Sequence, residues 1–411
     1  MTRPALESTV SFSSLLKRAV VDSHGAPVGR LDDALVRLRD DNYPLLVGLS
    51  MRGASGAIAI DASAVELANE TVSLPGAGTA QALAREEGDI SVRLDVLGHR
   101  LLDISRGQLV RAYDVRLGKT TEGWALVGLD VHKHRWFQFG DHAHHPTRDW
   151  HAFLLLAGSQ SSLRTRFSKR IRRLKPAQLA DILEGASVQE QGLLLDQIHS
   201  DPELEADVFE ELAEEKQARL LSSRSDQEIA EILSRMRADD VADAIMELPQ
   251  VRRQKVLDLL PQAQNAKVLT LLGYNPATAG GLMSTDYIAL SEDRSIADAL
   301  QALRVATTQQ PEALTTLHSL RADGTLAGTL SLVRALQLDA STLLRDAADP
   351  DTVGASPEED IIAVTTRMAD FNLLTLPVLD ASGKLLGIVT VDDALEAAIP
   401  REWLRRAPIR R

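Results

Sequence analysis

The chain has 411 residues, of which 44% are hydrophobic and 25% charged, and its formal net charge at pH 7 is −13. This composition is typical of a globular protein of roughly two to four domains, and the absence of cysteine excludes disulfides and thiolate chemistry. The negative charge argues against nucleic-acid binding, which requires a basic surface. No apolar run approaches the roughly 20 residues of a membrane-spanning helix, and no signal-peptide core is present. We therefore expect a cytoplasmic protein without a transmembrane segment.

The first 140 residues have the texture of β-structure, because short apolar runs alternate with Gly and Asp turns. The segment Val20–Gly25, followed by Leu45–Leu49, has a counterpart in Leu101–Gly107, followed by Ala125–Leu129. The spacing of roughly 80 residues indicates a repeat of domain size. This pattern resembles a tandem of PRC-barrel units, which are small β-barrel modules of assembly and interaction proteins. A β-rich, barrel-like domain is thus expected over residues 1–140.

Two segments are expected to be connectors. The Gly- and Ala-rich stretch Pro75–Ala84 would link the two β repeats. Residues 141–175 would form a polar connector that ends in a basic helix. Histidines gather near its start, where Asp141-His-Ala-His-His145 could ligate a transition metal or could simply belong to a polar linker. These histidines are His132, His134, His142, His144, His145 and His151.

From residue 176 to 273 the apolar residues recur with the period of an α-helix. Leu179–Leu183, Ile229–Leu233 and Val241–Ile245 are similar turns of successive short helices. This pattern predicts a helical-repeat superhelix whose apolar faces stack. Prolines stand at the expected first helical turns, where the missing N–H group does no harm: Pro176, Pro202, Pro249 and Pro261.

After Gly280-Gly281 the texture becomes mixed α/β in two similar units, residues 280–344 and 345–399, which precede a basic tail at 400–411. One unit alone buries little apolar surface, so we expect the two to pair. The predicted elements are helix 295–308, strands 314–320 and 326–332, helix 358–371, strands 375–379 and 385–389, and helix 391–398.

Two motifs carry a resemblance to a known family. The junction reads Leu272-Gly-Tyr-Asn-Pro-Ala-Thr-Ala-Gly-Gly-Leu-Met283, and the second unit closes with Leu376-Pro-Val-Leu-Asp-Ala-Ser-Gly-Lys-Leu-Leu-Gly-Ile-Val-Thr-Val-Asp-Asp393. From about Leu174 to Ala398 the chain is similar to the cytosolic half of MgtE magnesium channels, a helical domain joined to a pair of CBS domains. The implied fold class is multi-domain: a β-rich barrel-like N-terminus, an all-α helical-repeat middle domain and an α/β CBS domain pair. A membrane pore follows in that family, whereas we expect none here because the sequence ends at Arg411.

The same resemblance implies a site for Mg²⁺ between the helical domain and the second CBS domain. Mg²⁺ prefers oxygen ligands, and carboxylates that face each other repel when no cation is bound. The family's acidic turn falls on Asp239-Asp-Val-Ala-Asp243, whose outer residues share one helix face. The implied ligands are Asp207, Asp239, Asp243, Asp393 and Glu396. Mn²⁺ would take the same ligands.

Several of the family's acidic positions carry other residues in this chain. Asn275-Pro-Ala-Thr278 stands where the family has an acidic cluster, Asn372 replaces a second acidic residue, and Pro400–Arg406 replaces an acidic helix. We therefore expect a weaker or altered cation site. In the alternative interpretation, Asp239 is a first-turn helix charge and the other acidic residues are ordinary surface groups.

The CBS resemblance also implies a nucleotide site. Nucleotide-binding CBS domains hold ribose and phosphate with a Gly-h-h-Thr/Ser-x-x-Asp turn, where h is hydrophobic. Gly387-Ile-Val-Thr390-Val-Asp-Asp393 matches this turn, whereas the first unit has Arg334 in place of the acid. Thr390 and Asp393 could therefore hold ATP or AMP, or Thr390 could be a helix cap and nothing more.

No activated nucleophile, P-loop or dinucleotide fingerprint is present, so an enzyme is not expected. We expect a cytoplasmic, non-catalytic regulator of the magnesium transporter family that senses Mg²⁺ or Mn²⁺. Two alternatives stay open: an adenine-nucleotide-sensing CBS module that regulates a partner, and a structural scaffold that docks a membrane transporter. In each case the resemblance implies a homodimer through the CBS domains.

Overall fold

The computed structural model describes residues 8–39, 42–53, 56–67, 72–74, 89–132, 147–156, 170–306 and 311–399. The chain divides into two compact units, Met1–Leu212 and Ala213–Arg411, and each is described by itself. Among the described residues, no helix combines the length and the apolar character needed to cross a membrane. The β linker at Pro75–Ala84, most of the histidine cluster and the basic tail lie outside the described residues.

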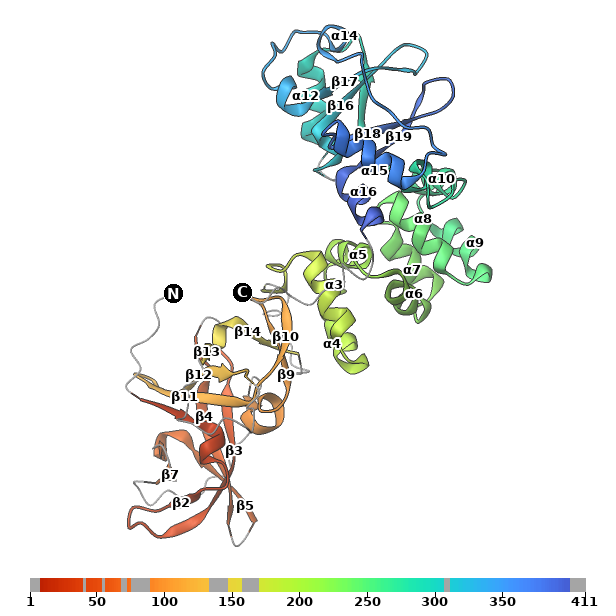
Figure 1. The fold of residues 1–411 in the computed structure, drawn as a ribbon. Coiled ribbons are helices and arrows are strands. Elements are labelled where there is room, and N and C mark those ends of the chain that lie inside the picture. Colours follow the sequence, from red (N-terminus) through yellow and green to blue (C-terminus); the bar gives the residue numbers. More distant parts are fainter. Residues whose placement is uncertain are drawn as a thin grey trace. The chain divides into compact units, whose positions relative to one another are not determined.

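The first unit begins with a nearly closed β barrel (Figure 1). Its main sheet has the order β1-β11-β12-β4-β3-β2-β7-β6, with β13, β5 and β8 pairing alongside, and a second sheet has the order β10-β9-β14. The strands are β1 (Thr9–Ser11), β2 (Ala19–Val21), β3 (Pro27–Arg37), β4 (Leu45–Gly53), β5 (Gly56–Asp61), β6 (Glu66–Leu67), β7 (Val72–Ser73), β8 (Asp89–Ser91), β9 (Arg100–Asp103), β10 (Gln108–Arg111), β11 (Asp114–Thr120), β12 (Gly123–Asp130), β13 (Arg148–Asp149) and β14 (Phe153–Leu155). Short helical turns interrupt them at α1 (Phe12–Leu15), η1 (Ala62–Ala64), η2 (Val92–Val96) and η3 (Trp150–Ala152).

The internal repeat is present in the barrel, and its two copies exchange their first strands. β1 of the first copy pairs with β11 of the second, and β8 of the second copy pairs with β3 of the first. Asp114 accepts hydrogen bonds from the Ser11 hydroxyl (2.5 Å) and the Ser13 backbone N–H (3.0 Å). Each copy is therefore completed by the other.

The equivalent contact in the other direction uses Asp33, which accepts from the Ser91 hydroxyl and from the Arg93 backbone N–H at 2.9 Å. Ser11 and Ser91 also cap the helical turns that follow them. A continuous core fills the barrel between the two copies, and it includes Phe12, Leu31, Val36, Leu101, Leu117 and Phe153.

The prediction of a polar connector is wrong for residues 148–155. β13 pairs with β12, and β14 pairs with β9, so this segment belongs to the β-rich region. The apolar side chains of Trp150 and Phe153 are buried in the barrel core. The sequence reading missed this because strands of two or three residues leave almost no alternation to detect.

Three helices follow in the first unit: α3 (Pro176–Gly185), α4 (Val188–Ile198) and α5 (Pro202–Glu210). Pro176 and Pro202 occupy the first helical positions, as predicted. Arg100 of β9 forms a salt bridge of 3.0 Å with Glu190 of α4, which joins these helices to the barrel.

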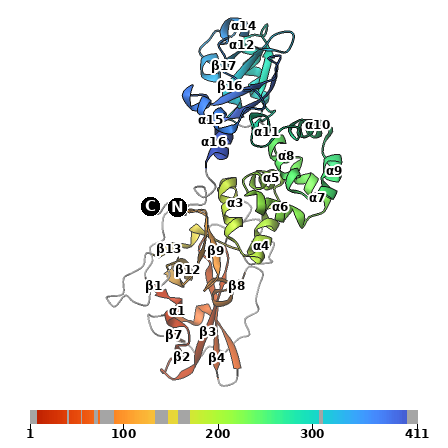
Figure 2. The same cartoon turned by 45° about the vertical axis from the view of Figure 1, so that its right-hand side comes forward.

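The second unit begins with an array of short helices whose apolar faces stack, as the helical period predicted (Figure 2). Pro249 and Pro261 stand one position earlier than predicted, at the N-caps of α9 and α10. The helices are α6 (Glu214–Ser222), α7 (Asp226–Leu233), α8 (Ala238–Glu247), α9 (Gln250–Leu259) and α10 (Gln262–Leu271).

Two α/β units complete the chain, and their elements follow the predicted order. β15 pairs in parallel with β16, which pairs antiparallel with β17, while β18 and β19 form an antiparallel pair. The elements are α11 (Ala279–Leu282), β15 (Ile288–Ser291), α12 (Ile296–Val305), η4 (Ala313–Thr315), β16 (Thr316–Leu320), β17 (Leu326–Ser331), α13 (Leu332–Ala335), α14 (Leu344–Ala347), α15 (Ile361–Asp370), β18 (Thr375–Leu379), β19 (Leu385–Thr390) and α16 (Val391–Ala398).

The junction between the helices and the α/β units is held by backbone contacts. The N–H groups of Ala279 and Gly280 donate to the carbonyls of Glu359 and Pro357, both at 2.8 Å. A side chain at position 281 would place its Cβ 2.3 Å from the Asn275 carbonyl oxygen, so glycine is required there. The junction therefore fixes the helical array of the second unit against its second α/β unit.

Candidate functional site

The candidate site lies where the N-terminus of α8 meets the N-terminus of α16. Asp239 and Asp240 occupy the first turn of α8, a position in which carboxylates interact favourably with the helix dipole. Asp393 lies in the first turn of α16, where Thr390 is the N-cap. The Thr390 hydroxyl donates to the Asp393 carboxylate at 2.5 Å and accepts from the Asp393 backbone N–H at 3.4 Å.

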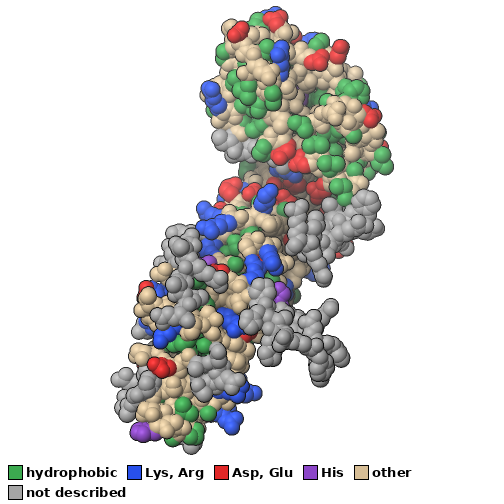
Figure 3. Space-filling view, turned by 60° about the vertical axis from the view of Figure 1, so that its left-hand side comes forward, with side chains coloured by type: hydrophobic (Ala, Val, Ile, Leu, Met, Phe, Trp, Pro, Cys, Tyr) green, Lys and Arg blue, Asp and Glu red, His purple; other side chains and the backbone are tan. Residues whose placement is uncertain are grey.

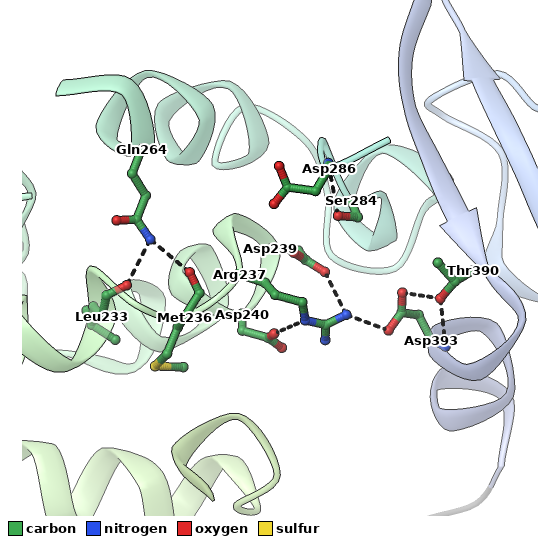
Figure 4. A network of polar contacts seen from close by, with 10 residues as sticks. All are labelled: Leu233, Met236, Arg237, Asp239, Asp240, Gln264, Ser284, Asp286, Thr390 and Asp393. Atoms are coloured by element: carbon green, nitrogen blue, oxygen red, sulfur yellow. Dashed lines mark hydrogen bonds and ion pairs between the residues drawn. The ribbon is translucent and has the colours of Figure 1, made fainter. Parts of the chain in front are cut away.

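Arg237 connects these carboxylates (Figure 4). Its Nε lies 2.6 Å from Asp240 Oδ2, and its Nη1 lies 3.3 Å from Asp393 Oδ1. The same Nη1 lies 3.7 Å from Asp239 Oδ2. We call Arg237, Asp239, Asp240 and Asp393 the Arg237 cluster. It joins the helical array to the second α/β unit through one guanidinium.

The charges of the Arg237 cluster are strongly coupled. Burial raises the pKa of Asp239 well above its usual value, and the neighbouring Asp240 carboxylate raises it further. Burial likewise raises the pKa values of Asp240 and Asp393, against the opposing effect of Arg237. Burial alone would lower the pKa of Arg237, but its three carboxylate neighbours raise it above the usual value. The guanidinium is therefore firmly charged, and each of the three carboxyl groups around it holds a proton more tightly than usual.

Two further predicted residues lie close to this cluster. Burial raises the pKa of Glu396 on α16, and the Asp240 and Asp393 carboxylates add to the effect. Burial raises the pKa of Asp243 on α8 to about 6, with contributions from Asp240, Glu214 and Glu247. Glu396 thus borders the cluster, whereas Asp243 faces acidic groups of α6 and α8.

Asp207 lies on α5, in the first compact unit. Burial raises the pKa of its carboxyl group, with Glu203 and Asp201 as its charged neighbours. The surroundings of Asp207 are therefore acidic as well, and both of these charged neighbours belong to the first compact unit.

Sequence reasoning missed Arg237 as a member of the site. The sequence does carry a signal for Arg237, which directly precedes the helix α8 as its N-cap residue. Ser, Thr, Asp and Asn are preferred at this position because their side chains accept a hydrogen bond, whereas an arginine side chain has no acceptor. Asp240 lies in the same acidic turn but is not among the predicted ligands, although it makes the shortest ion pair of the cluster.

The substituted family positions have local structural roles. Asn372 has a φ of 52°, a left-handed conformation that asparagine tolerates better than most residues. Asn275 accepts a hydrogen bond from the Ala277 N–H at 2.9 Å and so closes the turn before α11. Asn275 therefore stabilises a turn, and Asn372 suits a backbone conformation that few other residues adopt.

The cluster fits a divalent cation in its donor chemistry and its charge. Carboxylate oxygens are the ligands that Mg²⁺ takes, and Asp239 Oδ1 is buried without a hydrogen-bond partner among the described residues. In its arrangement the cluster is an ion-pair network, because Arg237 lies between the acids. In the part of the chain that the structure covers, no three His, Cys, Asp or Glu side chains are arranged to hold a metal ion.

The predicted histidine site can be followed at two of its members. His132 lies 3.3 Å from Asp130, and His151 lies 2.9 Å from Asp149 and packs edge-on against Tyr43. His134, His142, His144 and His145 lie outside the described residues. A histidine metal site therefore stays a prediction.

Comparisons with known proteins place both halves of this site in named domains. Residues 174–277 match the model of the MgtE intracellular N domain, and residues 344–399 match that of the CBS domain. The chain is 37% identical over 128 residues to the magnesium transporter MgtE of Thermus thermophilus and 28% identical over 126 residues to that of Enterococcus faecalis. Each match covers 31% of this chain and 28% of the transporter, so the chain spans little more than a quarter of these relatives.

Solved structures agree with this assignment. The cytosolic domain of the Mg²⁺ channel MgtE in complex with ATP is 28% identical, with a TM-score of 0.53, over 56% of this chain and 94% of that chain. The soluble part of a magnesium transporter, at 22% identity, shows the same fold with a TM-score of 0.53 over 57% of this chain and 91% of that chain. The chain therefore carries an MgtE intracellular N domain and a CBS domain after an N-terminal β barrel, and this part of it is similar to the cytosolic part of MgtE magnesium transporters.

Proposed function

We propose that this chain is a non-catalytic regulatory module whose state depends on cations at the contact between α8 and α16. The Arg237 cluster is the observation that carries this proposal, because three largely buried carboxyl groups from two domains meet there around one guanidinium. Such a contact is sensitive to any cation that reduces the repulsion between the carboxylates of α8 and those of α16. Its relatives are magnesium transporters, which makes Mg²⁺ the first ligand to test and Mn²⁺ the second.

The proposed cation ligands are Asp239 and Asp243 from α8, and Asp393 and Glu396 from α16. Asp207, the other acidic residue of the family pattern, belongs to the first compact unit and stays a prediction. Mg²⁺ keeps several of its waters, so one or two carboxylates from each side suffice. Binding would lower the repulsion between the two sides and stabilise the folded chain in proportion to its occupancy. The substitutions at Asn275–Thr278 and Asn372 make the expected affinity weak.

Thermal unfolding of the full chain in increasing MgCl₂ tests the proposal, with NaCl samples of equal ionic strength as the reference. We expect a saturable rise in the melting temperature at millimolar to tens of millimolar Mg²⁺, beyond the effect of NaCl. Asp239→Asn combined with Asp243→Asn should abolish this rise, because both changes remove charge and keep volume. Asp258→Asn, at an exposed position on α9, should leave it unchanged. Equal responses to MgCl₂ and NaCl would contradict cation sensing.

Adenine-nucleotide sensing is the second candidate. Thr390 and Asp393 lie together at the start of α16, as the nucleotide turn requires, and a similar cytosolic domain has been solved in complex with ATP. In the present arrangement Asp393 is already engaged by Thr390 and Arg237. Calorimetric titration with ATP and AMP separates the candidates, since nucleotide binding lost in Asp393→Asn would favour this function.

A homodimer through the CBS-like units is the proposed assembly. The surface between α12 and α13 is hollowed and lined by Leu300, Leu303, Leu314, Leu332 and Leu336, and that between α15 and α16 by Met368, Leu373, Leu374, Val391 and Leu395. Apolar side chains also show on the visible face of these units, at the top of Figure 3. Exposed apolar surfaces of this kind favour association, and two equivalent faces suit a two-fold dimer.

We further propose a cytoplasmic location, with attachment to a membrane transporter through a partner contact. The β barrel precedes the first matched domain, which begins at residue 174, and it is the region proposed to dock the partner. A structural scaffold that does no more than dock a transporter remains the third interpretation. It would bind the partner with the same affinity in the presence and absence of Mg²⁺.

A further inference from the structure

Arg237 occupies a position that local helix chemistry disfavours. It is the N-cap residue of α8, with φ −64° and ψ 150°, and its side chain makes no capping hydrogen bond. The N-terminus of a helix carries partial positive charge, so a cation there is destabilising unless anions neutralise it. A residue that breaks a local rule is expected to serve a contact elsewhere in the structure.

That contact is the set of three carboxylates around the guanidinium. Asp240 and Asp239 belong to the same helix, whereas Asp393 belongs to α16 and is separated from Arg237 by 156 positions in sequence. The Arg237 side chain is 20% exposed, and those of Asp239 and Asp393 are each 11% exposed. An ion pair this far from solvent is screened little by salt, and removing one partner leaves the other charges buried and unpaired.

The guanidinium therefore lies where a divalent cation would have to bind. A metal ion that bridged Asp239 or Asp240 to Asp393 would need the oxygens that Arg237 contacts. Guanidinium is a planar, permanently charged group whose N–H donors satisfy several carboxylates at once. The Arg237 guanidinium can hold two acidic surfaces together, as a bound metal cation does. Unlike a metal ion, it is covalently attached to one of the two surfaces.

We propose that Arg237 is a resident cation, which closes the contact between the helical array and the second CBS-like unit without metal and competes with divalent cations for the same carboxylates. This inference rests on the proposed function and deepens it, because it names the residue that sets the cation affinity. In the parent chain the contact stays closed at low Mg²⁺, and divalent cations must displace a tethered competitor. Without Arg237, the contact opens in the absence of cation and closes at much lower Mg²⁺.

The test compares Arg237→Gln with the parent chain and with Arg252→Gln. Arg252 is a matched control, because its side chain is also 20% exposed and pairs with Asp226 at 2.6 Å, within the helical array alone. The chain has no cysteine, so Lys255→Cys on α9 and Ala381→Cys in the turn between β18 and β19 give two unique labelling sites. Both positions are exposed. Labelled chains are diluted with an excess of unlabelled chain, so that distances report on single chains.

Distances between the labels are measured by electron paramagnetic resonance during titration with MgCl₂ against NaCl of equal ionic strength. We expect a narrow distribution for the parent chain and for Arg252→Gln without Mg²⁺, and a broad one for Arg237→Gln. Added Mg²⁺ should narrow the distance distribution of Arg237→Gln. The Mg²⁺ concentration at the midpoint of this narrowing should be at least about tenfold lower than the midpoint of Mg²⁺ binding to the parent chain, which is measured by calorimetry. Tenfold is the effect of roughly 1.4 kcal/mol of lost competition.

Three results would overturn the inference: a narrow distribution for Arg237→Gln without cation, equal Mg²⁺ midpoints in the two chains, or the same broadening in Arg252→Gln. Failure of the proposed function looks different. If Arg237→Gln opens but neither chain responds to Mg²⁺ beyond NaCl, Arg237 holds the contact closed and the chain does not sense this cation. Conversely, the parent chain could respond to Mg²⁺ at low concentration and Arg237→Gln could respond in the same way. This result would support cation sensing and would show that Arg237 plays no part in it.

Discussion

Arg237 and Asp393 form a salt bridge of 3.3 Å between the N-cap of α8 and the first turn of α16. Both groups come from helix N-termini, whose partial charges favour the aspartate and disfavour the arginine. The pair therefore depends on the meeting of two domains, because neither helix alone would stabilise a guanidinium at this point. The same meeting brings Asp239, Asp240 and Glu396 to one place.

Asp243 should make stability depend on pH with a characteristic sign. Its pKa in the folded chain is raised to about 6, chiefly by burial. The folded state therefore binds a proton more tightly than the unfolded state, and the resulting stabilisation is present at pH 4 and lost as the pH rises through 6. Asp243→Asn should remove this dependence, whose size is limited by solvent screening because the Asp243 side chain is exposed. Urea unfolding at pH 4 and pH 8 checks it: the variant should gain stability over the parent at pH 8, and Asp258→Asn should not.

His318 should produce a pH dependence of the opposite sign. Its side chain is fully buried, Nδ1 lies 3.2 Å from the Ile288 carbonyl oxygen, and Nε2 has no partner among the described residues. Burial lowers the pKa of His318 to about 4. The unfolded chain takes up a proton first as the pH falls, so up to about 3 kcal/mol of stability is lost between pH 6.5 and 4.

Hydrogen exchange of the β15 to β17 amides at pH 6.5 and pH 4.5 measures this loss locally. His318→Leu should flatten the dependence, because the side chain can no longer be protonated. His24→Leu, at an exposed position of the barrel, is the control. An equal loss of protection in the parent chain and in His318→Leu would assign the acid sensitivity to other groups.

The proposed dimer should be broken by charge on its apolar faces. Leu336 and Leu395 are 66% and 48% exposed, and they line the hollows beside α13 and α16. Leu336→Glu combined with Leu395→Glu should turn a dimer into a monomer in light scattering at tens of micromolar, because a buried unpaired carboxylate is costly. Val251→Glu adds a charge at a site that is 78% exposed on α9 and should leave the mass unchanged. A monomeric parent chain would disprove the assembly directly.

The exchanged strands of the barrel should make Asp114 and Asp33 unusually important for its stability. Asp114→Ala would leave the Ser13 N–H without its acceptor and remove the bond to Ser11. Asp33→Ala would remove the equivalent bonds from the Arg93 N–H and the Ser91 hydroxyl. Hydrogen bonds to a charged group contribute about 1.5–3 kcal/mol, so each variant should lose at least this amount in urea unfolding followed by barrel tryptophan fluorescence. Asp22→Ala removes bonds within a single exposed turn and should cost clearly less. Similar losses in all three variants would show that the exchange adds nothing.

Much of the fold could be predicted because its signals are local. The strand at residues 375–379, the turn at 380–383 and the helix at 391–398 agree with the structure, since alternation, turn residues and a threonine cap all lie within a few positions of each other. The repeat of roughly 80 residues was also readable, because similar units keep similar patterns. Short strands such as β13 and β14 were missed, because they are defined by their partners.

The sequence by itself determined the order of the domains, the periods of their helices and strands, and the presence of carboxylates at Asp239, Asp243, Asp393 and Glu396. Tertiary structure decided which of these groups meet and what lies between them. The pairing of β1 with β11, the hydrogen bonds that Asp33 and Asp114 accept from the other repeat, and the place of Arg237 all depend on contacts between residues far apart in the chain. Local patterns carry no information on such contacts, because their energies arise when burial removes water from charges that the folded chain brings together.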